Sequence, residues 1–277
     1  MIRILITGSK GYTGSMILEQ LKIVKSYFKM NYRDLDFLIF EIKELNKSSV
    51  INFSTIKFDF IFHCSVVGGR SYELNDQSVY DDNMNMFLML KNLNYKKIVH
   101  FTSAADLDRR LEIDKCNPAE IFNRNPIDPF GKVKNEICRI VKDKKLGLNV
   151  RIFNLFGHPS INRNQFIDNL LDNCDFKDFF EIKNDRYFDF FNVNDLSIII
   201  FKILTNELDE DYNLSYNIKI KISELAKYIF ESAGLQKEII IKKQGKNYTG
   251  SNFYKIDEIE SKHPFLSFKE LNKMTKL

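Results

Sequence analysis

The N-terminal segment constrains the fold more than any other part of this sequence. Ile2 to Ile6 form a short apolar run that is typical of a buried strand, and Thr7 and Gly8 end it. Glycines recur at every third position from Gly8 through Gly11 to Gly14, and apolar side chains then follow at helical spacing: Ile17, Leu21, Val24 and Phe28. A strand, a glycine turn and a helix in this order predict backbone N–H groups that can approach a pyrophosphate at the helix N-terminus.

The same alternation continues through the first half of the chain. Further strands are predicted at Phe37–Phe40, Phe60–His63, Lys97–Phe101 and Leu148–Phe153, with helices at 84–93 and along the face Phe130, Val133, Ile137, Cys138 and Val141. The pattern predicts an α/β fold with a Rossmann-like, doubly wound parallel sheet. We expect residues 1–155 to form an NAD(P)-binding domain and 156–277 a mainly substrate-binding domain, with a segment near 186–205 returning to the first.

The second half of the chain has a different pattern of predicted strands and helices. Helices are predicted at Phe166–Leu171, Leu196–Leu204 and Leu225–Ala233, the last entered from Ser223 and closed by Gly234. A late strand is predicted at Ile239–Ile241. No linker rich in Pro, Gly or Ser separates the halves, so the second half, a smaller C-terminal α/β domain, is expected to pack directly onto the first.

Composition narrows the class of protein. The 277 residues are 28% charged with a formal net charge of +4, and no long basic block suggests a nucleic-acid partner. The cysteines Cys64, Cys116, Cys138 and Cys174 are widely spaced without a CxxC pair, which argues against zinc and against a disulfide framework. Neither a signal peptide nor an apolar run of membrane-spanning length is present. We expect a soluble cytoplasmic protein without a metal site or a membrane partner.

Charged residues near the glycine loop leave the coenzyme open between NAD(H) and NADP(H). Glu41 ends the second strand, where a carboxylate would hold the adenosine ribose hydroxyls and repel a 2′-phosphate. Lys10 and Lys43 instead favour NADP(H), because either could bind that 2′-phosphate.

Motifs along residues 2–195 resemble those of the extended short-chain dehydrogenase/reductases, in the group of nucleotide-sugar epimerases and dehydratases. Thr7–Gly14 is similar to that family's TGxxGxxG loop, Phe101–Ala105 to its serine-bearing strand end, and Pro129–Lys134 to its PYGxxK motif. Other similar stretches occur in the family's order: Phe62–Ser65, Asn83, Arg151–Gly157 and Asp189–Asp195. The stretches Glu44–Asn46 and Val66–Gly69 most resemble 4-keto-sugar reductases such as GDP-fucose synthase and dTDP-4-dehydrorhamnose reductase.

The resemblance implies hydride transfer at a sugar carbon. In this family a tyrosine passes the proton, a lysine one helical turn later lowers the tyrosine's pKa and holds the nicotinamide ribose, and a serine binds the reacting oxygen. These roles imply Lys134 and Ser103, with Thr102 a lesser candidate for the hydroxyl, and Asn154 facing the sugar or its phosphate. The implied coenzyme contacts are Gly8, Lys10, Gly11, Tyr12, Thr13, Gly14, Glu41, Cys64, Asn83 and Lys134. A nucleotide-sugar substrate and a homodimer are also implied.

The tyrosine position holds Phe130, which has no hydroxyl and cannot be a general acid. Three explanations stay open: an engineered change that traps a substrate in a working enzyme, a natural binding protein that kept the fold, or an enzyme that uses Ser103, Asp106 or water as the acid.

Other departures narrow the chemistry further. Ala104 and Ala105 follow Ser103, where sugar dehydratases carry Asp-Glu after the threonine and GDP-fucose synthase a cysteine, so dehydration and epimerisation by that route are not expected. Residues 162–164 occupy the loop where that synthase has a histidine. Phe188 replaces the family's arginine, which leaves Arg186 as the candidate for a phosphate contact. We predict NAD(P)H-dependent reduction of a 4-keto nucleotide-linked sugar or deoxysugar, disabled by Phe130. The alternatives are a non-catalytic NAD(P)- or nucleotide-sugar-binding protein and a C4 epimerase.

Overall fold

The computed structural model describes residues 1–31, 36–68, 76–157, 166, 167, 170, 178–216, 219–232 and 234–250. The chain divides into two compact units. The first comprises Met1–Arg110, Pro118–Ile152 and Leu196–Tyr212, and the second comprises Leu111–Asn117, Phe153–Asp195 and Asn213–Leu277. The predicted roles of the two parts in coenzyme and substrate binding stay predictions.

A six-stranded sheet with the order β11-β6-β4-β3-β1-β2 carries the first unit. Its strands are β1 (Ile2–Thr7), β2 (Phe37–Ile42), β3 (Lys57–His63), β4 (Asn94–Ser103), β6 (Gly147–Ile152) and β11 (Tyr212–Leu214). The neighbours from β6 to β2 all pair in parallel. The predicted α/β class with a doubly wound parallel sheet is therefore confirmed.

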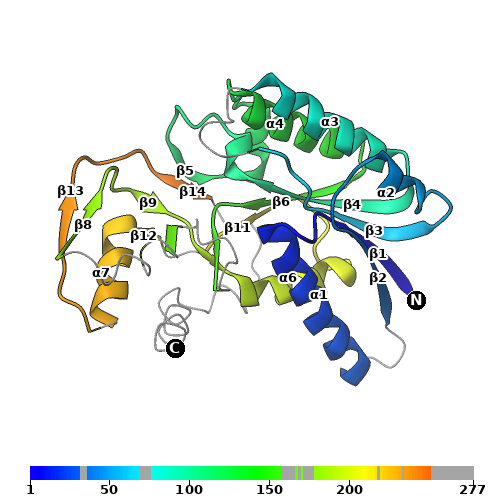
Figure 1. The fold of residues 1–277 in the computed structure, drawn as a ribbon, viewed down its shortest axis with the longest axis horizontal. Coiled ribbons are helices and arrows are strands. Elements are labelled where there is room, and N and C mark those ends of the chain that lie inside the picture. Colours follow the sequence, from blue (N-terminus) through cyan, green and yellow to red (C-terminus); the bar gives the residue numbers. More distant parts are fainter. Residues whose placement is uncertain are drawn as a thin grey trace. The chain divides into compact units, whose positions relative to one another are not determined.

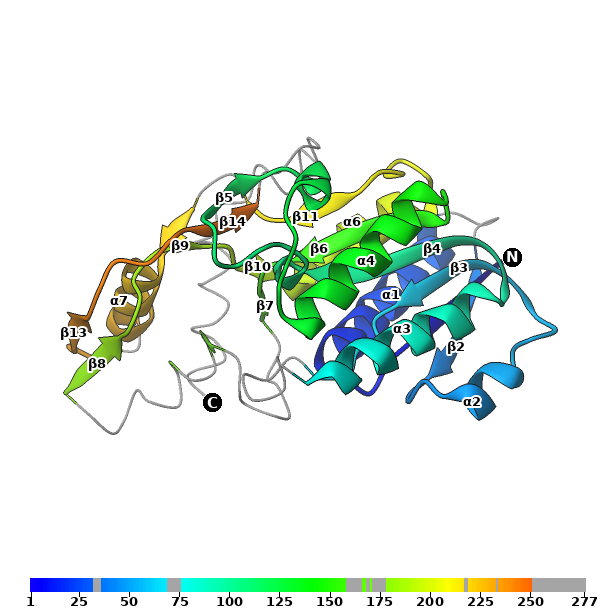
Figure 2. The same cartoon turned by 90° about the horizontal axis from the view of Figure 1, so that it is seen from above.

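Helices cover both faces of this sheet (Figures 1 and 2). Figure 1 shows α3 (Gln77–Lys91) and α4 (Pro129–Asp143) on one face, and α1 (Tyr12–Asn31) and α6 (Leu196–Leu204) on the other. A short helix, α2 (Lys47–Ile51), follows β2. The core beneath α3 and α4 includes buried side chains of β1, β3, β4 and both helices: Leu5, Phe58, Ile98, Phe87, Val133 and Ile137. The predicted apolar face of α1 is buried as expected. α3 begins earlier than predicted because Asp76 caps it, its side chain accepting from Ser78 N.

The strand order places a switch point between β1 and β3. After β1 the chain forms β2 on one side, and β3 then pairs with β1 on its other side. In parallel α/β sheets, ligands bind outside the carboxyl ends of the strands at such a point. The glycine loop after β1 and the loop after β3 both lie at this place.

Among its described residues, the second unit contains short strands and the helix α7. Its sheets have the orders β12-β9-β14-β5, β13-β8 and β10-β7. The strands are β5 (Ile113–Cys116), β7 (Leu155–Phe156), β8 (Phe179–Ile182), β9 (Tyr187–Phe188), β10 (Phe191–Asn192), β12 (Ile220–Lys221), β13 (Glu238–Ile241) and β14 (Tyr248–Gly250). Helix α7 (Ile222–Ser232) packs its apolar side chains into this unit's own core, which includes Leu225, Ile229 and Phe230.

Helix α7 begins earlier than the sequence predicts. Ser223 was expected to precede its helix, and this is wrong, because α7 begins at Ile222. Asp185, distant in sequence, accepts hydrogen bonds from Ser223 N at 3.0 Å and from Ser223 Oγ at 2.9 Å. Gly234 has φ +73°, in agreement with its predicted place at the end of the helix. The predicted helix Phe166–Leu171 falls partly outside the described residues.

Candidate active site at the carboxyl ends of the strands

The glycine loop is shaped by its own backbone. Gly8 has φ +71°, and a Cβ atom there would lie 2.8 Å from Ser65 N, so only glycine lets the loops after β1 and β3 touch. A Cβ atom at Gly14 would lie 2.0 Å from Gly8 O. At Gly11, by contrast, the nearest atom to such a Cβ is Gly8 O at 3.4 Å, which is an ordinary contact. Gly8 and Gly14 are therefore required by the fold, whereas Gly11 leaves space above the N-terminus of α1.

The different surroundings of Gly14 and Gly11 predict different effects of alanine at the two positions. Replacing Gly14 by alanine should lower the free energy of unfolding, because the methyl group meets backbone that cannot move away cheaply. Replacing Gly11 by alanine should leave the unfolding transition nearly unchanged but weaken coenzyme binding about tenfold or more, since a bound pyrophosphate would meet the methyl group. Urea titration and coenzyme titration of both variants measure this, and equal loss of stability in both would contradict it.

Asn83 fixes the loop that follows β3. Its Oδ1 accepts from Val67 N at 3.0 Å, and its Nδ2 donates to Val67 O at 2.9 Å and to Val79 O. Cys64, the first residue of this loop, is half-buried, and loss of solvation raises the pKa of its thiol. The structure therefore gives Asn83 a positioning role for the 64–68 loop, while direct coenzyme contact by Asn83 or Cys64 stays a prediction.

Adjacent residues at the end of β4 have different surroundings. Thr102 is buried, and its Oγ1 donates to Asp106 Oδ2 at 3.2 Å. Ser103 is half-buried, and none of the described residues forms a hydrogen bond with its hydroxyl. Ser103 thus has a hydroxyl available for a ligand, and that of Thr102 is already used within the protein.

Helix α4 carries Phe130 and Lys134 on one face. Asp128 caps this helix by accepting from Gly131 N at 2.8 Å, and Pro129 occupies its first turn. The ring of Phe130 is 7% exposed and packs against Val79 and Ala105. The Nζ atom of Lys134, one turn later, lies 5.1 Å from the centre of that ring. This packing places α4 against Ala105, close in sequence to Ser103.

Lys134 is a buried lysine on α4. Only 8% of the residue is exposed, and burial lowers the pKa of its ammonium group. His63 lies at the end of β3 and bonds to Thr7 Oγ1 at 3.1 Å, and its ring stacks on that of His100 at 5.1 Å. Burial lowers the pKa of His63 to about 3, and it lowers the pKa of His100 well below the ordinary value. Both imidazoles are therefore neutral at physiological pH and do not compete with Lys134 for an anion.

A buried ion pair supports the strand end behind Ser103. Arg151 Nε lies 2.8 Å from Asp106 Oδ1, and the two side chains are 3% and 0% exposed. The same carboxylate accepts from Thr102, and Cys138 Sγ lies 3.5 Å from its Oδ2. Asn135 Nδ2 donates to the backbone oxygen of Asp106 at 2.8 Å, which joins this short helical turn (Ala104–Asp106) to α4. Asp106 is thus an anchored carboxylate, poorly placed to donate a proton.

The end of β2 meets the glycine loop through backbone and side chains. Gly8 N donates to Ile42 O at 2.8 Å, and Glu41, one residue earlier, is exposed. Lys10 is also exposed, and it has a partner that was not predicted: its Nζ lies 2.8 Å from Glu44 Oε1. Tyr12 and Thr13 are half-buried in the first turn of α1.

The predicted substrate residues Asn154 and Arg186 belong to the second unit. Asn154 is half-buried between β6 and β7, and its backbone oxygen accepts from Phe191 N at 2.8 Å. The guanidinium carbon of Arg186 lies 5.1 Å from the ring centre of Phe188 and 5.4 Å from that of Tyr248. Its buried Nε has no hydrogen-bond partner within the described part of the chain. Residues 162–164 lie outside the described residues.

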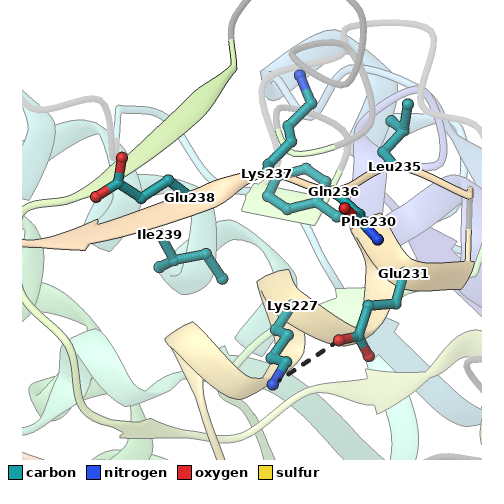
Figure 3. A pocket seen from close by; sticks show the side chains of 8 residues that line it. All are labelled: Lys227, Phe230, Glu231, Leu235, Gln236, Lys237, Glu238 and Ile239. Carbon is teal, nitrogen blue, oxygen red and sulfur yellow. Dashed lines mark ion pairs between the residues drawn. The ribbon is translucent and has the colours of Figure 1, made fainter.

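The second unit also contains a pocket. This pocket of about 470 Å³ is formed by α7 and β13, and none of the predicted site residues lines it (Figure 3).

Within the described ranges, no group of His, Cys, Asp and Glu side chains is arranged to hold a metal ion. Over the same ranges, no helix combines the length and the apolar character that crossing a membrane requires. The cysteines of these ranges, Cys64, Cys116 and Cys138, are not joined in disulfides.

Comparison with known proteins identifies the family. The model of the NAD-dependent epimerase/dehydratase family matches residues 4–218. The chain belongs to this family. The match includes the glycine loop, the Ser103 strand end, α4 and the segment 189–195, so the family resemblance of the sequence is confirmed. A comparison with curated proteins finds no match.

Solved structures of several family enzymes have the same fold. A dTDP-4-dehydrorhamnose reductase from Clostridium acetobutylicum is 16% identical, with a TM-score of 0.77 over 100% of both chains. A UDP-glucose 4-epimerase from Thermotoga maritima is 16% identical, with a TM-score of 0.75 over 99% of both chains. The GDP-mannoheptose C4 reductase of Campylobacter jejuni, solved with NADP bound, is 16% identical, with a TM-score of 0.73 over 100% of this chain and 98% of its own. At these identities the comparison shows a shared fold.

Proposed function

We propose that this family member is an NAD(P)H-dependent reductase of a 4-keto nucleotide-linked deoxysugar, strongly impaired by phenylalanine at position 130. One observation carries the proposal. A glycine loop with space above the N-terminus of α1 occurs in the same unit as Ser103, whose hydroxyl has no partner among the described residues, and Lys134, a buried cation. This combination suits a dinucleotide and a carbonyl oxygen that becomes negatively charged.

The residues present fit a nicotinamide dinucleotide. Gly11 admits the pyrophosphate to the N-terminus of α1, because its missing Cβ faces space that the protein does not fill. Glu41 and Lys10 lie at the end of the sheet where the adenosine ribose is bound in this kind of fold. Lys134 would hold the nicotinamide ribose, and the 64–68 loop, fixed by Asn83, would form a wall of the site. When bound, the reduced coenzyme supplies a hydride.

The chain's own residues account for the remaining chemistry. The Ser103 hydroxyl donates to the carbonyl oxygen of the substrate and stabilises the charge that develops on it. The Lys134 ammonium adds positive charge in a buried environment, where electrostatic interactions are stronger than in water. Phe130 provides a ring surface but no proton. Asp106 does not replace the missing acid, because Arg151 holds it in a buried ion pair. Proton delivery is therefore the impaired step.

The substrate class is supported by the neighbours and by two residues of the second unit. The neighbours include reductases of dTDP-4-dehydrorhamnose and of a GDP-heptose. Asn154 and Arg186 supply an amide and a guanidinium group suited to a sugar hydroxyl and a diphosphate. We also propose a homodimer formed through α3 and α4, where the exposed Leu88 would be covered.

Transfer of isotope tests the proposed reaction. The protein at high concentration is incubated with NADH or NADPH deuterated at the transferred position and with 4-keto-6-deoxy sugars linked to GDP, dTDP or UDP. We expect slow formation of a product with one deuterium at C4 and one coenzyme oxidised per product. Bound coenzyme without deuterium transfer, even over long incubation, would contradict a residual reductase activity.

A C4 epimerase is the second candidate, because UDP-sugar 4-epimerases share the fold over nearly the whole chain. An epimerase would convert a 4-hydroxy nucleotide sugar without net use of added coenzyme and without taking its deuterium. The same incubation, run in parallel with 4-hydroxy nucleotide sugars in place of the 4-keto sugars, therefore separates the two activities. A non-catalytic binding protein would bind coenzyme or nucleotide sugar and perform neither conversion.

A further inference from the structure

Lys10 and Glu44 form an ion pair at the edge of the proposed coenzyme site. Lys10 Nζ lies 2.8 Å from Glu44 Oε1, and the side chains are 70% and 72% exposed. Lys10 belongs to the glycine loop and Glu44 follows β2, and the backbone bond from Gly8 N to Ile42 O holds these segments together. The pair therefore connects the loop that meets a pyrophosphate with the strand end that meets the adenosine ribose.

The charges around this pair bear on the choice between the two coenzymes. NADP carries one more phosphate than NAD, on the 2′-oxygen of that ribose, and a phosphate monoester has a charge of about −1.5 to −2 at pH 7. Glu41 is exposed, and none of the described residues forms an ion pair with its carboxylate. Glu44 adds a second carboxylate and neutralises the cation of the glycine loop. Lys43, two residues after Glu41, is another exposed lysine.

We infer that Glu44 sets the coenzyme preference of this chain towards NAD(H), by holding Lys10 away from a 2′-phosphate. The inference rests on the proposed function, because it assigns the coenzyme of the same site. Glu44 raises the pKa of Lys10 through their hydrogen bond, and Lys10 lowers that of Glu44, so both groups are charged at neutral pH. Exposed ion pairs contribute little to stability, so Glu44 can be changed without loss of the fold.

Coenzyme titration of a double-mutant cycle tests this inference. The chain has no tryptophan, so binding of NADH and NADPH can be followed through the coenzymes' own fluorescence in the original chain, Glu44→Gln, Lys10→Met and the double variant. We expect the original chain to bind NADH more tightly than NADPH. Glu44→Gln should tighten NADPH binding about tenfold, the size of one exposed charge-assisted contact, and change NADH binding less than about twofold. Lys10→Met should remove that gain in the double variant.

A matched control removes the same charge elsewhere. Glu231 pairs with Lys227 on α7 at 3.8 Å, with side chains 62% and 70% exposed, and Figure 3 shows both. Glu231→Gln should leave both affinities unchanged. The inference is overturned if Glu44→Gln does not change the NADPH to NADH ratio, if Glu231→Gln changes it equally, or if the gain persists without Lys10, which would point to Lys43. If neither coenzyme binds any variant, the proposed function fails together with the inference.

Discussion

Replacing Phe130 by tyrosine is expected to raise the rate of 4-keto-sugar reduction by about 10²–10⁴-fold, the usual contribution of a positioned general acid. The measurement is the initial rate of NADH or NADPH oxidation with 4-keto-6-deoxy nucleotide sugars. Coenzyme affinity should change little, because a single oxygen is added to a ring that already packs in place. The change is then in turnover and not in binding.

The surroundings of Phe130 explain why one atom should have this effect. The ring is held by Val79 and Ala105, so a tyrosine ring can adopt the same position. Lys134 lies one helical turn later with its Nζ 5.1 Å from the ring centre. A cation at this distance favours the phenolate and lowers the pKa of a tyrosine hydroxyl from its ordinary value of about 10. The supporting machinery of the acid is therefore present around a ring without a hydroxyl.

Two controls distinguish chemistry from a general effect of the substitution. Phe122→Tyr adds the same oxygen to a ring outside the site, 37% exposed and in contact with Arg139, and should not change the rate. Lys134→Met in the Phe130→Tyr background should remove most of the gain. If the tyrosine variant binds coenzyme as the original chain does and still shows no turnover, the chain is a binding protein and the proposed reductase is wrong.

The elements that the sequence predicted well are those with local signals. The strand, glycine turn and helix at the N-terminus follow from apolar periodicity and from glycines whose backbone demands are local. The predicted apolar face of α4 with Phe130, Val133 and Ile137 is also confirmed, because its apolar residues recur at strongly helical spacing. Lys134 and Ser103 were named through motifs, and their catalytic roles stay predictions.

What the sequence missed depends on contacts between distant residues. β5 and β14 pair in parallel although more than a hundred residues separate them, and neither is long enough to show a period of two. The ion pair between Lys10 and Glu44 was not predicted, because nothing local in the sequence links these two residues. Asp106 was considered as a proton donor because its ion pair with Arg151 is not visible in the sequence. Arg151 lies two strands further along the chain, and no spacing rule connects the two residues.

That ion pair gives the prediction with the largest expected effect on stability. Replacing Arg151 by methionine should lower the free energy of unfolding by about 3–5 kcal/mol, because it leaves a charged carboxylate buried without its cation. Asp106 is 0% exposed, so water cannot take over the role of the guanidinium group. Urea titration followed by circular dichroism measures this loss.

Neutralising the partner tests the cause of that loss. Adding Asp106→Asn to the Arg151→Met variant should recover more than half of the lost stability, because the amide oxygen can still accept from Thr102 and carries no charge. Lys227→Met, which breaks an exposed pair, should change stability little. A double variant as unstable as Arg151→Met alone would mean that packing of the arginine side chain, and not its charge, holds the end of β4. In that case the support behind Ser103 would be steric, and Asp106 would have no electrostatic part in it.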